Sequence, residues 1–287
     1  MCLFSKKEKT PKEPQYYLSA TNSQTYNYRV YYMNKAEKVL YFLLAFIVGG
    51  VVGLIFYGGL AKNEFGERTV TTWILDAIIV VVLGTISGFA YLPIRTNQIK
   101  EKKRKDLKLQ FRELLDAVVT SIGSGKNIRD AFISARYDLS IIYSESTSII
   151  KELDVIIDGI NNNIDIEKSL LDFGYRSGID DIIGFANVFE TCYRKGGNIR
   201  DVIRNTQQII TEKMEVEMEI ETIVSGSKNE QLIMTVLPIG LIAVIKMMSP
   251  DFAENFASPA GIGATTVAVI LFVAAYFVGK KMLDIKI

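Results

Sequence analysis

The chain has 287 residues, 49% of them hydrophobic, and its 33 basic side chains are nearly balanced by 32 acidic ones, which leaves a formal net charge of +1. It contains no histidine, which excludes Ser-His and Cys-His nucleophilic pairs, histidine proton transfer and histidine metal sites. The balanced charge gives no indication of a nucleic-acid partner. The hydrophobic residues are concentrated in blocks, so we expect a membrane protein.

Residues 1–38 are polar and basic, and we interpret them as a cytosolic arm whose first part is disordered. No apolar segment follows the first charges closely enough for a secretory signal, so we expect no export. The cysteines, Cys2 and Cys192, lie far apart, which favours two free thiols. A group of tyrosines before the first apolar run predicts an aromatic belt at the membrane interface: Tyr26, Tyr28, Tyr31 and Tyr32.

A transmembrane hairpin is predicted for residues 39–93. Val39–Leu60 and Ile74–Leu92 are apolar runs of about the 20 residues that cross the hydrocarbon core of a bilayer. We expect the second helix to end before Pro93, because proline cannot donate the next helical hydrogen bond. Asp76 is expected near the lipid headgroups, since it lies at the start of its run.

The charges that follow this hairpin predict its orientation. Arg95–Lys108 contains seven basic residues against two acidic ones, which is typical of the cytoplasmic side of a membrane. With this cluster inside, the N-terminal arm is also cytosolic and the polar loop at 62–68 faces outside. The juxtamembrane position explains the cluster without a nucleic-acid role.

Residues 94–230 are soluble in character, and their apolar residues recur three and four positions apart, with no alternation typical of strands. This pattern predicts a cytosolic bundle of about six helices, the size of one small domain. We expect helices to end at Gly123, at Asn161, near Gly174 and at Gly196. The amphipathic stretches are 107–122, 128–135, 149–160, 166–173, 182–192 and 199–210.

One motif occurs twice at the start of a predicted helix: GKNIRDAF at 125–132 returns as GGNIRDVI at 196–203. Glycine, a capping asparagine and an aspartate in the first turn form a general helix-start signal, so capping explains the repeat by itself. The alternative is a shared surface that receives a partner. Its candidate contacts are Asn127, Arg129, Asp130, Asn198, Arg200 and Asp201.

The last cytosolic helix carries an acidic face over residues 212–221, where five glutamates accompany one lysine. We interpret it either as a solvated face or as a docking surface formed by Glu212, Glu215 and Glu219. Acid catalysis is not expected, because no neighbour is visible that would raise a glutamate pKa. The GSGKN segment at 123–127 lacks the spacing and the preceding strand of a phosphate-binding loop.

A second transmembrane hairpin is predicted for residues 231–287, with spans at Leu232–Met248 and Gly261–Gly279. The loop between them, 249–260, has no basic residue and is expected outside. The lysines after the last span, which include Lys286, place the C-terminus in the cytosol.

Small residues one helical turn apart permit close helix packing in lipid. The sequence offers Gly49 and Gly53 in the first span and Gly84 and Gly88 in the second, and Pro238 lies within the third. Packing inside one subunit and packing between subunits both fit this pattern. No span carries a charged residue at its centre, so ion or proton transport is not expected.

Together these elements predict an all-α, polytopic membrane protein with four transmembrane helices and a cytosolic bundle of about six helices between the second and the third. From residue 107 onward the chain resembles the type II secretion system F-domain proteins, and within them the platform proteins of Tad/Flp-type pili. A single F domain between two membrane hairpins is similar to the Tad type. The resemblance rests on FRELLDA at 111–117, the motifs at 125–132 and 196–199, Leu237-Pro238, and SPDF at 249–252.

The resemblance implies a platform protein in the cytoplasmic membrane that is not an enzyme and needs no cofactor. Its implied partners are a hexameric secretion ATPase, pilin subunits, the lipid bilayer, and a second copy or a sibling F-domain protein, with no nucleic acid. The alternative is a membrane-anchored helical sensor or signalling adaptor. A membrane-embedded aspartyl peptidase would need intramembrane aspartates that the chain does not offer.

Overall fold

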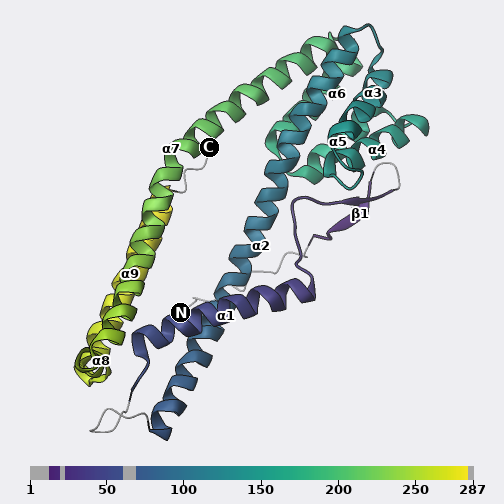
Figure 1. Ribbon diagram of the computed structural model, residues 1–287. Coiled ribbons are helices and arrows are strands. Elements are labelled where there is room, and N and C mark those ends of the chain that lie inside the picture. The colour runs from purple at the N-terminus through teal and green to yellow at the C-terminus, as the bar shows by residue number, and fades with distance from the viewer. Residues whose placement is uncertain (1–12, 20–22, 61–68, 284–287) are drawn as a thin grey trace, which may run out of the picture. The chain divides into compact units, whose positions relative to one another are not determined.

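The computed structural model describes residues 13–19, 23–60 and 69–283. Contacts between residues divide this part of the chain into two units (Figure 1). The bundle unit holds the described residues up to Tyr32 together with Thr96–Met214, and the membrane unit holds Met33–Arg95 together with the described residues from Glu215 onward. The elements in chain order are β1 (Tyr16–Leu18), β2 (Gln24–Tyr26), α1 (Lys35–Tyr57), α2 (Val70–Gly123), α3 (Ile128–Ile142), α4 (Ser148–Asn161), α5 (Ile166–Ser177), α6 (Asp180–Lys195), α7 (Ile199–Met248), α8 (Pro250–Ala257) and α9 (Pro259–Leu283).

The helices of the bundle unit are the second part of α2, α3 to α6, and the first part of α7, which confirms the predicted bundle of about six helices. The apolar stripes predicted from the sequence supply its buried core. Four phenylalanines form a chain of ring contacts at its centre, with centroids between 5.4 and 6.0 Å apart: Phe111, Phe173, Phe185 and Phe189. Helix periodicity therefore located most of the core residues, although Val188 and Ile209 of the predicted stripes are 49% and 61% exposed.

Two helix ends differ from the expectation. Helix α2 continues through Pro93, because proline removes only its own N–H donor and the flanking residues keep their helical hydrogen bonds. Helix α5 passes Gly174 and ends before Gly178, whose φ of 61° is one that glycine adopts easily. Gly174 serves packing instead, since a Cβ atom there would lie 3.3 Å from the Cα of Ile183 on α6.

The N-terminal arm packs on the bundle. Strands β1 and β2 form an antiparallel hairpin in which Tyr17 lies opposite Thr25. Tyr28, two residues beyond β2, is only 4% exposed and belongs to the bundle core. On α2, the Lys103 ammonium lies 5.0 Å from the centre of the Tyr26 ring.

The prediction of an aromatic belt is therefore wrong for Tyr26 and Tyr28, which pack in the bundle unit. Nearness in sequence to the first span does not place these tyrosines in the membrane unit, because that unit begins only at Met33. The disorder expected at the start of the chain concerns residues 1–12, which lie outside the described part. Cys192 is a free thiol as predicted, and Cys2 lies outside that part.

In the described part of the chain, four helices are long and apolar enough to cross a membrane, which confirms the four predicted spans: α1, α2, α7 and α9. The outer loop predicted at 249–260 is wrong in part, because it contains the short helix α8, which begins at a capping serine. Figure 1 shows α9 returning along α7, where the Gln231 amide donates to the Tyr276 carbonyl at 3.2 Å. The polar loop at 62–68 and Lys286 lie outside the described residues.

Candidate interaction surfaces

The first copy of the repeated motif starts α3. The Asn127 side chain accepts a hydrogen bond from the Asp130 N–H at 2.9 Å and donates one to the Asp130 carboxylate at 2.7 Å. The Arg129 guanidinium reaches the last turn of α4 and donates to the Ile160 carbonyl at 2.5 Å. Carbonyls in the last turn of a helix have no partner within the helix, and a cation is favoured there. The motif therefore caps the start of one helix and the end of another.

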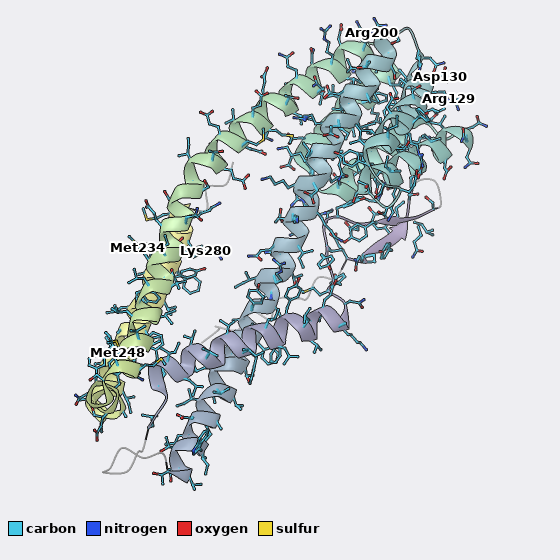
Figure 2. All side chains as sticks on the ribbon, in the orientation of Figure 1. Arg129, Asp130, Arg200, Met234, Met248 and Lys280 are labelled. Atoms are coloured by element: carbon cyan, nitrogen blue, oxygen red, sulfur yellow. The ribbon has the colours of Figure 1, made fainter. Side chains whose placement is uncertain are left out.

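The second copy repeats two of these contacts at the start of α7. The Asn198 amide donates to the Asp201 carboxylate at 2.6 Å. Arg200 donates to the Ile122 carbonyl, in the last turn of α2, at 3.0 Å. Since α3 begins shortly after that turn, both copies lie at one end of the bundle, where Figure 2 shows Arg129, Asp130 and Arg200.

The repeat is thus a capping device that the fold uses twice. Helix capping explains why both copies carry asparagine, arginine and aspartate at the same spacing. The six candidate residues are also exposed, so a protein docked at this end of the bundle could reach all of them: Asn127, Arg129, Asp130, Asn198, Arg200 and Asp201. Their role as partner contacts stays a prediction.

The acidic face of α7 presents Glu212, Glu215 and Glu219 as exposed side chains. Lys213 points elsewhere, because its ammonium lies 2.8 Å from a carboxylate oxygen of Asp181 on α6. Burial raises the pKa of Asp181, but the ammonium groups of Lys213 and a second lysine on α2 lower it by more, so the net pKa lies below its usual value. The lysine therefore joins α7 to the bundle and leaves the face acidic.

A buried charge network that the sequence analysis missed joins α4, α5 and the arm. Arg176 is fully buried and donates to the two oxygens of Glu152 at 2.7 and 2.6 Å, and to Asp172 at 2.8 Å. It also donates to the Tyr26 carbonyl at 3.3 Å, while its own carbonyl accepts the Tyr28 N–H at 2.9 Å. Burial lowers the pKa of Arg176, but the two carboxylates raise it by more, so the guanidinium stays charged.

The sequence analysis also missed an exposed apolar stripe on α3. Ile133, Tyr137 and Ile141 follow one another at four-residue spacing and are 44%, 68% and 74% exposed. The helix turns its other apolar face to the core, so α3 is apolar on two sides. Contiguous apolar side chains on a soluble helix are typical of a surface that binds another protein.

The glycines predicted for membrane packing lie between α1 and α2. A Cβ atom added at any of them would approach an atom of the facing helix to between 2.5 and 2.8 Å: Gly49, Gly53, Gly84 and Gly88. The two helices of this hairpin therefore pack closely within one chain, and at Gly49 and Gly84 a backbone carbonyl oxygen of the facing helix lies within 3.1 Å of the added Cβ. Pro238 lies inside α7, which continues through it.

Comparisons of this chain with protein-family models, with curated proteins and with solved structures give no match.

Proposed function

We propose that this multi-pass helical membrane protein is a platform protein of a Tad-like pilus or type II secretion machine in the cytoplasmic membrane. It would couple a cytosolic secretion ATPase to pilin assembly or protein export, with its bundle and both termini in the cytosol. The observation that carries the proposal is the continuity of α2 and α7, which have 54 and 50 residues. Each passes without a break from an apolar span into the bundle unit.

Unbroken helices can transmit a movement from one end to the other. At 1.5 Å per residue, the two provide about 80 and 75 Å of helix, which is more than twice the hydrocarbon thickness of a bilayer. A helix keeps its length when it is pushed or rotated, since its backbone hydrogen bonds run along its axis. A displacement imposed on the bundle by an ATPase would therefore reach the spans and the pilin subunits beside them.

Three exposed features outside the apolar spans support docking of the ATPase. They are the end that carries both capping motifs, the acidic face of α7, and the apolar stripe on α3. The stripe is flanked by charges of both signs, Asp130 and Asp138 with Arg129 and Arg136, so we expect an apolar ATPase surface with polar edges. Oligomerisation, with a second copy or a sibling F-domain protein, would then use other surfaces.

The test is crosslinking in native cells, with affinity purification of the full-length tagged chain from membranes and identification of its partners by mass spectrometry. Two surface variants are compared with wild type: Glu212→Lys with Glu215→Lys and Glu219→Lys on α7, and Tyr137→Ser with Ile141→Ser on α3. We expect wild type to recover a hexameric secretion ATPase and at least one variant to recover about tenfold less of it.

The control is Asp158→Lys, a charge reversal at an exposed position of α4 that belongs to neither varied set of residues. It should recover the ATPase like wild type, and all variants should melt at the same temperature. Absence of an ATPase from every sample, together with normal pilin display after deletion of the gene, would contradict the platform function. Specific binding of a small molecule to the bundle would then favour a sensor.

A further inference from the structure

The four predicted spans contain two ionisable residues of the Asp, Glu, Lys and Arg types, Asp76 near the start of the second and Lys246 near the end of the third. Both line one cavity of the membrane unit, which has a volume of about 780 Å³ and is bounded by α1, α2 and α7. Pockets of about 300 to 1,000 Å³, mostly apolar with a few placed polar groups, are the usual size and chemistry of ligand sites. Charged residues in spans also mark functional sites far more often than charged residues elsewhere.

The end of α1 holds the two charges at one depth. The Gly59 N–H donates to an Asp76 carboxylate oxygen at 2.9 Å, and the Lys246 ammonium donates to the Phe56 carbonyl at 3.1 Å. These two backbone groups are three residues apart, so they fix an anion from α2 and a cation from α7 beside the same turn. Trp73 lines the cavity at this end, and tryptophan is the residue typical of the headgroup level.

The rest of the cavity wall is apolar. Helix α1 contributes Val51 and Leu54, α2 contributes Val80, and α7 contributes Ala243. A fitting ligand must therefore carry a positive and a negative group at one end and hydrocarbon at the other. Since the two charges belong to different helices, one compact headgroup that bears both signs would join them.

We propose that this cavity binds a zwitterionic phospholipid with a primary amine, of the phosphatidylethanolamine type. Its ammonium donates to the Asp76 carboxylate, its phosphate accepts from the Lys246 ammonium, and an acyl chain lies along the apolar wall. An anionic lipid without the amine would bring its phosphate to Lys246 but leave Asp76 unmatched. A choline headgroup has the positive charge but no N–H to donate, so its contact with Asp76 is weaker.

The experiment uses the purified, delipidated full-length chain in detergent, with native mass spectrometry and thermal melting as two readouts. The added lipids are dioleoyl phosphatidylethanolamine, phosphatidylcholine and phosphatidylglycerol. We expect phosphatidylethanolamine to bind about tenfold more tightly than the other two, the factor that one charge-assisted hydrogen bond supplies, and to raise the melting temperature most.

Two conservative variants separate the contacts. Asp76→Asn keeps an oxygen for the Gly59 N–H and should remove the preference for phosphatidylethanolamine, while phosphatidylglycerol binds as before or better. Lys246→Gln keeps a donor for the Phe56 carbonyl and should weaken all three lipids. The control is Glu230→Gln, a charge change beside the smaller groove between α7 and α9, which should alter nothing.

Equal binding of the three lipids by wild type would overturn the proposal, as would unchanged lipid preference in Asp76→Asn. Failure to detect bound lipid would also overturn it. A dimer that is broken by the cavity variants would assign the cavity to a protein helix instead and would count against a lipid. The test needs no ATPase or pilin, so its result is independent of the platform function.

Discussion

Arg176 stabilises the packing of the arm on the bundle. Its guanidinium bonds two carboxylates and a backbone carbonyl of the arm, without exposure to water. We predict that Arg176→Met lowers the free energy of unfolding by about 3–5 kcal/mol, because Glu152 then stays buried without its partner. Urea denaturation of the detergent-solubilised chain, followed by circular dichroism, measures the change.

Two further variants check the cause. Adding Glu152→Gln to Arg176→Met should restore part of the lost free energy of unfolding, since the buried negative charge is then removed as well. Lys168→Met is the control, because its ion pair with Asp165 joins side chains that are 56% and 54% exposed, so its loss should change the free energy of unfolding very little. A loss for Arg176→Met no larger than that of the control would contradict the prediction.

Tyr143 makes the stability of the fold depend on pH in the alkaline range. Burial and the hydrogen bond from its hydroxyl to Glu113, 2.6 Å long, raise its pKa to about 12. Between about pH 10 and pH 12 the unfolded tyrosine loses its proton while the folded one keeps it, so stability falls as pH rises through this range.

The comparison with Tyr143→Phe isolates this effect, because all other groups titrate alike in both chains. At pH 8 wild type should melt at a higher temperature than the variant, because it has one more hydrogen bond. This difference in melting temperature should shrink above about pH 10. A constant difference from pH 8 to pH 11.5 would show that Tyr143 is not coupled to folding in this way.

At the scale of elements, the contact between α1 and α2 can be tested at its glycines. A Cβ atom at Gly49 would lie 2.5 Å from the Ser87 Cβ and 3.1 Å from the Leu83 carbonyl oxygen, so Gly49→Ala forces the helices apart. We predict a loss of about 1–3 kcal/mol, as for other overpacked sites. Thermal melting of the full chain in detergent measures it.

Gly240 provides the matched control within α7. A Cβ atom there meets no described atom within 4 Å, so Gly240→Ala should be neutral or should stabilise the helix by about 0.5–1 kcal/mol. If both substitutions changed the melting temperature alike, helix propensity and not close packing would explain the result at Gly49.

The sequence predicted those elements whose signals are local. The four spans follow from length and hydropathy, and the starts of α3 and α7 follow from capping residues that act within one turn. The β hairpin was missed because its strands have three residues each and depend on the bundle for support. Gly174 was predicted to end a helix, whereas its close contact with α6 is what explains a glycine at this position.

The candidate site residues show the same difference between local signals, which the sequence reveals, and tertiary contacts, which it does not. Asn127 and Asn198 could be recognised as caps, and the four packing glycines as a small-residue pattern, because both devices have fixed spacings. Arg176 and Glu152 could not, since a charged residue in an amphipathic helix is expected in solvent until a partner 24 residues away is known. The pairing of Asp76 and Lys246 in one cavity likewise depends on which spans meet.

At the scale of the whole molecule, the arm restricts the topology. Its described residues pack in the bundle unit, so the two spans between arm and bundle must return the chain to the same side of the membrane. Together with the basic cluster after α2, this favours arm and bundle in the cytosol and α8 outside.

Cysteine labelling tests that orientation in a background with Cys2→Ser and Cys192→Ser. A membrane-impermeable maleimide should label Ala260→Cys in intact cells and should label Ser124→Cys only after the cells are opened; both positions are exposed. Labelling of Ser124→Cys in intact cells would show that the bundle faces outside, and the cytosolic ATPase would then be excluded as a partner.

The place of Tyr28 in the bundle core has a consequence for biosynthesis. The arm leaves the ribosome first, but its partner Arg176 lies 150 residues beyond Tyr26 and is translated after both spans of the first hairpin. At about 5–20 residues per second this interval is about 8–30 s. The hairpin is thus translated before the bundle can close, and the nascent arm has no complete binding site until the helices that form it have been made.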